Sequence, residues 1–96
     1  MEYQLRDYKV KKGQLSAFVR EWLSKVYPLR LKSGFRVIGA WTVGKDRFIW
    51  MLGWEGPGEF EEADRSYYQS PERTQLKPDP ARHLAGTSKH MMTSVL

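Results

Sequence analysis

Segments with strand periodicity and segments with helix periodicity follow one another along the 96 residues in the order strand, helix, strand, strand, helix, strand. This order predicts an α+β domain of ferredoxin-like βαββαβ topology, in which a four-stranded antiparallel sheet carries two helices on one face. The length allows one compact core, so residues 1–96 are assigned to a single domain.

The first strand is expected at residues 2–10, where side chains of two kinds alternate. A period of two is typical of a strand, because successive side chains point to opposite faces of a sheet. The alternation places Tyr3 and Leu5 on one face and Gln4, Arg6 and Tyr8 on the other. Gly13 breaks the pattern and ends the segment.

A helix is expected next, because apolar residues recur at the i, i+3, i+4, i+7 spacing that forms one face of a helix. These residues are Leu15, Phe18, Val19, Trp22, Leu23 and Val26. Pro28 lacks a backbone N–H and its ring clashes with the preceding turn, so we expect a kink or an end near Tyr27. A second short turn to Lys32 would then stop at Gly34.

A hairpin is expected from residues 35–43 and 47–54, which are rich in β-branched and aromatic residues and flank the turn residues 44–46. In the second strand, alternation places Phe35, Val37 and Trp41 on one face and Ile38 and Ala40 on the other. In the third strand, it places Phe48, Trp50, Leu52 and Trp54 on one face and Ile49 and Met51 on the other. Both strands are therefore apolar on both faces.

A second helix and a final strand complete the predicted order. The helix is marked by Phe60, Ala63 and Tyr67 at helical spacing. Pro71 ends this helix or begins a new turn, since proline suits the first position of a helix. Residues 77–80 form another break, and residues 88–96 are expected to be the last strand.

The apolar second face of the sheet predicts a partner, because a sheet face that meets water is normally polar. The simplest cover is a second copy of the same sheet, related by a two-fold axis. Such a homodimer would bury about 1,200–2,000 Å² in total. The alternative is that the open face binds RNA or a lipid.

Composition excludes several classes of site. The chain has no cysteine, which rules out disulfides and thiolate chemistry and favours a reducing, cytoplasmic location. The longest apolar run, residues 48–54, is far shorter than a membrane span, and no signal-peptide pattern opens the chain. Sixteen basic and 11 acidic residues give a net charge of +5. Because these charges are scattered along the chain, we interpret them as a solubilising surface.

Four stretches resemble the NIPSNAP family. They are Tyr3–Tyr8 with the following Lys-Lys-Gly13, Gly34–Trp41, Phe48–Glu55, and Tyr67–Arg73 with the preceding Phe60, Ala63 and Asp64. The resemblance implies a dimeric α/β barrel. The superfamily of that name includes small monooxygenases, isomerases, dehydratases and haem-binding enzymes. The NIPSNAP family supplies no catalytic motif that can be transferred residue by residue. The resemblance therefore does not decide whether the chain is an enzyme.

Five residues are candidates for ligand binding: Tyr8, Arg36, Trp50, Tyr68 and His90. His90 could be a general acid or base, since the pKa of histidine lies near neutrality. Tyr68, next to the expected core residue Tyr67, could aim a phenol at a ligand. A buried arginine could bind an anionic ligand, or it could form an ion pair with a carboxylate across the dimer, which we favour.

Two functions remain in view. The first is binding or transformation of a hydrophobic small molecule, for example an aromatic one. Cofactor-free monooxygenase-like chemistry is included, because the sequence shows no cofactor motif and no set of metal ligands. The alternative is a non-catalytic protein-interaction module. RNA binding is disfavoured, because residues 47–54 lack the glycine-flanked aromatic pattern of the RNA-recognition fold, so no nucleic-acid partner is expected.

Overall fold

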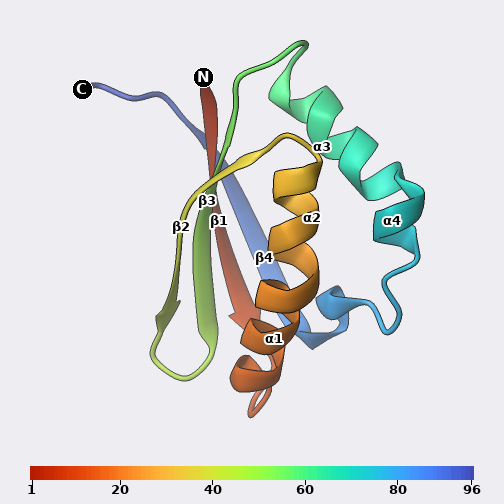
Figure 1. Cartoon of the computed structure of the whole chain (residues 1–96). Coiled ribbons are helices and arrows are strands. Elements are labelled where there is room, and N and C mark those ends of the chain that lie inside the picture. The colour runs from red at the N-terminus through yellow and green to blue at the C-terminus, as the bar shows by residue number, and fades with distance from the viewer.

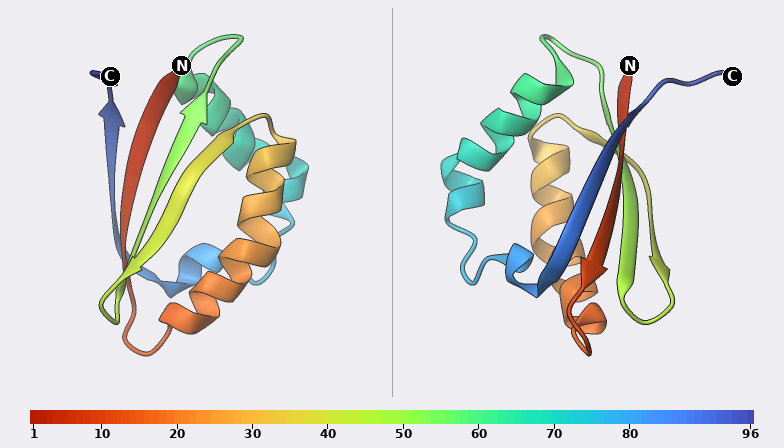
Figure 2. Two further views of the ribbon diagram at one scale, coloured as in Figure 1. Left: turned by 60° about the vertical axis from the view of Figure 1, so that its left-hand side comes forward. Right: turned by 180° about the vertical axis from the view of Figure 1, so that it is seen from behind.

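The computed structural model describes all 96 residues and contains one antiparallel sheet of four strands in the order β2-β3-β1-β4. The strands are β1 (Glu2–Val10), β2 (Arg36–Val43), β3 (Arg47–Trp54) and β4 (Leu84–Met92). Both helical segments lie on the same side of this sheet, as Figures 1 and 2 show. This arrangement confirms the predicted βαββαβ topology.

The first helical segment is a continuous rod that carries a wide turn in its middle (Figure 1). It consists of α1 (Leu15–Glu21), a π-helical turn (Trp22–Val26) and α2 (Tyr27–Lys32). The expected disturbance near Tyr27 therefore occurs as a change of helix type, and the rod continues through Pro28. A π-helical turn shifts the hydrogen bonds to i→i−5, which gives room where a proline ring would otherwise clash.

The second helical segment stands farther from the sheet and leads to the last strand. It contains α3 (Phe60–Gln69) and α4 (Pro71–Thr74), and a 3₁₀ turn (Pro80–His83) then precedes β4. The final strand begins earlier and ends earlier than residues 88–96, because its pairing with β1 runs from Val10 opposite Leu84 to Tyr3 opposite Met92. The length of β1 thus sets the length of β4.

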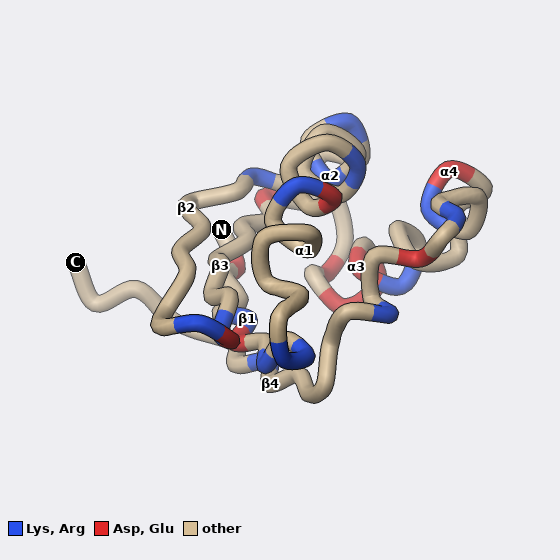
Figure 3. Tube along the Cα trace, turned by 90° about the horizontal axis from the view of Figure 1, so that it is seen from below, with Lys and Arg blue, Asp and Glu red and all other residues tan.

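The core fills the space between the sheet and the helices. Its buried apolar side chains are Tyr8 and Val10 of β1, Phe48, Trp50 and Leu52 of β3, Phe18, Trp22 and Val26 of the first rod, Phe35 just before β2, and Phe60 and Tyr67 of α3. The predicted apolar faces of the first helix and the third strand are confirmed by this set, except that Leu23 is 54% exposed and lies off the helix face that packs on the sheet. Charged residues of both signs are spread along the chain (Figure 3).

One face assignment is wrong, and a β-bulge explains why. The pairing of β2 with β3 shifts between Val37 and Gly39, so Val37 lies beside the buried Leu52 while Trp41 lies beside Ile49 on the open face. A bulge inserts one extra residue and so reverses the alternation beyond it. Trp41 is consequently half exposed instead of sharing a face with Val37.

The 3₁₀ turn is fastened to α1 by polar side chains. The guanidinium of Arg82 donates two hydrogen bonds to the Glu21 carboxylate, at 2.8 and 2.7 Å, and a ring nitrogen of His83 lies 2.9 Å from the same group. The hydrogen bond from Arg82 is the main reason that the pKa of Glu21 falls to about 2.

None of the helices has the length and the hydrophobicity that crossing a membrane requires.

Candidate functional site

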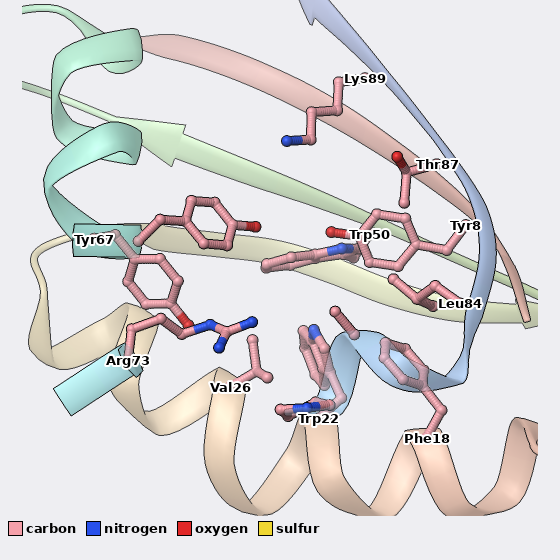
Figure 4. A pocket seen from close by; sticks show the side chains of 13 residues that line it. Tyr8, Phe18, Trp22, Val26, Trp50, Tyr67, Arg73, Leu84, Thr87 and Lys89 are labelled. Carbon is pink, nitrogen blue, oxygen red and sulfur yellow. The ribbon is translucent and has the colours of Figure 1, made fainter. Parts of the chain in front are cut away.

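A cavity of about 120 Å³ lies between the sheet and the two helical segments (Figure 4). Nine of its 13 lining residues are hydrophobic. The lining comprises Tyr8, Phe18, Trp22, Val26, Trp50, Tyr67, Tyr68, Arg73, Pro80, Ala81, Leu84, Thr87 and Lys89. Residues from nearly every element meet there, so the cavity is a product of the whole fold.

Three of the five candidate residues, Tyr8, Trp50 and Tyr68, line this cavity. Tyr8 and Trp50 occupy neighbouring strands on the helix-facing side, and their rings meet edge to face with centroids 6.3 Å apart. Tyr68 enters from α3 and stands at the edge of the cavity, while its neighbour Tyr67 is buried, as expected. The period of each element is what brings these three side chains together.

The other two candidates, Arg36 and His90, lie elsewhere. Arg36 is exposed and its guanidinium is 3.2 Å from the Glu55 carboxylate. His90 is paired in register with Leu5, which puts it on the open face of the sheet. The inward positions of β4 are instead Thr87 and Lys89, which follow from the register of that strand with β1.

Below the cavity, two buried arginines share one carboxylate. Arg6 of β1 and Arg30 of α2, both with 0% exposure, each place a guanidinium nitrogen 2.8 Å from Oδ1 of Asp64 on α3. The expected ion pair of a buried arginine therefore exists, but its carboxylate comes from the same chain and not from across a dimer. Arg6 also donates hydrogen bonds to the hydroxyls of Tyr68, at 2.7 Å, and Tyr8, at 3.3 Å.

These charges favour ionisation of each nearby phenol, but burial opposes it, and the balance differs from one phenol to the next. Burial raises the pKa of Tyr8, and burial likewise raises the pKa of Tyr67. Burial also works against ionisation of Tyr68, but the nearby charges of Arg6 and Arg30 outweigh it, so the pKa of Tyr68 is lowered. Tyr68 is thus the lining phenol that most readily becomes a phenolate.

Sequence reasoning missed several lining residues. Arg73 and Lys89 place cations over the Tyr68 ring, at 5.4 and 5.6 Å from its centroid. Arg30 stacks on the face of Tyr67 at 3.6 Å. The local sequence pattern contains no signal for these contacts, because they depend on how the helices and strands pack against one another.

An outer groove of about 430 Å³ adjoins the cavity. The two hollows share Tyr68, Arg73 and Ala81 in their walls. Arg73 is held there by an ion pair with Asp79 at 3.0 Å. The groove gives the small inner cavity a route to solvent and room for the rest of a larger ligand.

Replacement of Asp64 by asparagine should strongly destabilise the protein, because it leaves two buried guanidinium groups without a counter-charge. We expect the free energy of unfolding to fall by about 3–5 kcal/mol. Glu61→Gln on the same helix is the matched control, since both members of its pair with Arg65 are exposed and the loss should be about 1 kcal/mol or less. Urea unfolding of both variants measures the difference, and equal losses would show that Asp64 is not the central counter-charge.

Solved structures with the same fold include NIPSNAP domain proteins and proteins described as antibiotic biosynthesis monooxygenases. A NIPSNAP family protein from Agrobacterium tumefaciens superposes with a TM-score of 0.83 at 12% sequence identity, over 96% of this chain and 90% of that chain. An uncharacterized NIPSNAP domain protein from Burkholderia xenovorans gives 0.82 at 11% identity, over 98% and 94%. A putative antibiotic biosynthesis monooxygenase from Nitrosomonas europaea gives 0.74 at 10% identity, over 100% of both chains.

At these identities the structural likeness establishes the ferredoxin-like fold and nothing about activity. No curated protein matches the sequence. The sequence profile of the NIPSNAP family matches residues 3–93, which is nearly the whole chain. Together with the predicted motifs in the strands and in α3, this match shows that the chain belongs to the NIPSNAP family.

Proposed function

We propose that the protein binds a hydrophobic small molecule with an aromatic ring in the cavity between the sheet and the helices. The observation that carries this proposal is the combination of an apolar wall with a few convergent polar groups, which is typical of small-molecule sites. The inner volume is close to that of engineered cavities of about 150 Å³ that admit one benzene ring. Larger ligands would extend into the outer groove.

Occupancy of the cavity can be tested by blocking its mouth. Ala81→Phe puts a ring where the cavity and the groove meet, and Ala85→Phe is the control at an exposed alanine outside the lining. A panel of one- and two-ring aromatic compounds should quench tryptophan fluorescence, because Trp22 and Trp50 form the wall. We expect affinity to fall by about tenfold or more in Ala81→Phe only. Equal affinity in both variants would place the ligand elsewhere.

The finer proposal is cofactor-free oxygenation, with Tyr68 as the base. In this chemistry the Tyr68 phenolate takes a proton from an acidic C–H of the substrate, and the electron pair stays on the substrate. The substrate anion then reduces O₂, so that a CH₂ group becomes a carbonyl, with one oxygen atom retained and the other released as water. A phenol of lowered pKa at the cavity wall supports this proposal, as does the fold shared with proteins described as monooxygenases.

The ionisation of Tyr68 can be followed by tyrosinate absorbance. A transition should occur below the ordinary phenol value of 10, because Arg6 and Arg30 favour the phenolate. Tyr68→Phe should remove that transition, whereas Tyr67→Phe should keep it, since burial raises the pKa of Tyr67. If Tyr68→Phe leaves the early part of the titration curve unchanged, Tyr68 is not poised to act as a base.

We also propose that the protein is a homodimer through the open face of its sheet. That face carries Trp41, which is half exposed, next to Ile49, and it carries Leu5 and Met51 farther along. Trp41 folds over Gly39, where an added Cβ would come within 2.5 Å of the indole ring. An apolar patch of this kind, beside the ion pair of Asp7 with Arg47, is typical of an interaction site, and a second copy would present a matching surface.

Sedimentation at micromolar concentration tests the dimer. Trp41→Lys should convert the dimer to a monomer, because it places a charge on the apolar open face. Leu31→Lys is the matched control, since Leu31 is 46% exposed on the helical side and Trp41 is 50% exposed on the sheet. A monomeric wild-type protein, or a dimer that persists in Trp41→Lys, would contradict the proposal.

A further inference from the structure

Two buried hydrogen-bond donors in the cavity wall have no partner. They are Nε1 of Trp22 and the hydroxyl of Tyr67, on side chains that are each 3% exposed. Buried polar groups in proteins are almost always paired, so two unpaired donors in one wall need an explanation. A ligand that brings acceptor atoms into the cavity would pair them.

The charged groups around the cavity are predominantly cationic. The lining itself contains Arg73 and Lys89 but no aspartate or glutamate. Behind the wall, Arg6 and Arg30 share the single carboxylate of Asp64, and Arg73 is paired with Asp79. Four cations thus face two carboxylates, and Lys89 forms no salt bridge with any carboxylate. An apolar wall with low dielectric strengthens the field of this excess positive charge.

The apolar and the charged groups occupy different parts of the cavity. Figure 4 shows Phe18 and Leu84 at one end, with Arg73 beside Tyr67 at the other and Lys89 above them. Arg73 and Lys89 both lie within 6 Å of the Tyr68 ring, where the cavity meets the outer groove. A bound molecule would therefore place its apolar body inside and its charge toward Tyr68.

We propose that the ligand is an organic anion, an aromatic carboxylate or enolate whose negatively charged oxygen lies near Arg73 and Lys89. Its ring fills the apolar end, and its oxygen atoms accept hydrogen bonds from the donors of the wall. This inference rests on the proposed function and defines the substrate class of the same cavity. It also fits a base at Tyr68, because Arg73 and Lys89 lie over that ring and would stabilise an enolate formed beside it.

A matched series of single-ring compounds tests the charge of the ligand. Benzoate, benzyl alcohol and benzylamine differ mainly in carrying a negative charge, no charge and a positive charge at neutral pH. Binding is followed by the NMR signals of the indole N–H groups of Trp22 and Trp50 during titration of the labelled protein. We expect benzoate to bind about tenfold more tightly than benzyl alcohol, and benzylamine to bind most weakly.

Substitutions of the cations give the second readout. Arg73→Gln and Lys89→Gln should each lower the affinity for benzoate several-fold more than the affinity for benzyl alcohol. Arg36→Gln is the control, because Arg36 is also an arginine paired with a carboxylate but lies outside the cavity. Equal binding of benzoate and benzyl alcohol would overturn the anion inference and leave the proposed cavity function intact. Failure of all three compounds to shift the indole signals would overturn both.

Discussion

The ion cluster of Arg6, Asp64 and Arg30 is the constraint on which the rest of the structure depends. It joins one strand of the sheet and one helix from each of the two helical segments through a single carboxylate oxygen. Two fully buried guanidinium groups are costly unless each is paired and hydrogen-bonded. The position of α3 over the sheet is therefore set by the need to bring Asp64 to both arginines.

This constraint also explains why a cavity exists beside a well-packed core. The long arginine side chains and the ring of Tyr67, which stacks on Arg30 at 3.6 Å, hold α3 away from the strands. On the side of α1, the 3₁₀ turn is fixed by Arg82 and His83 on Glu21. Pro80 lies in the wall between these supports, and Ala81 lies where the cavity meets the outer groove. The cavity is thus the space left between two rigid polar anchors, and the apolar side chains only line it.

Much of the fold could be predicted from the sequence, because hydrophobic periodicity depends on local geometry. The face of the first helix and the inward side of β3 follow directly from the spacing of their apolar residues. Trp41 was misplaced because a bulge adds one residue without a local signal, and an alternation read along the strand cannot register it. The bounds of β4 were shifted because they depend on pairing with β1, which is distant in sequence.

Residues of the candidate site could be predicted only where the regular spacing of side chains along a strand or helix places them on the inward face. Tyr8, Trp50 and Tyr68 could be named because their elements present them at regular positions. Arg73 and Lys89 were missed because their roles come from the packing of α4 and β4 around Tyr68.

The two faces of the sheet can serve different purposes because side chains alternate strictly along β1. Arg6 and Tyr8 point to the cavity side, while Leu5 and Asp7 point to the open face. The bulge in β2 adds Trp41 to that open face, while Val37, before the bulge, stays beside the core. A partner on the open face would therefore stiffen the same strand that carries Arg6. Any coupling between assembly and ligand binding would run through β1 and β3, since both strands place residues in the cavity wall and on the open face.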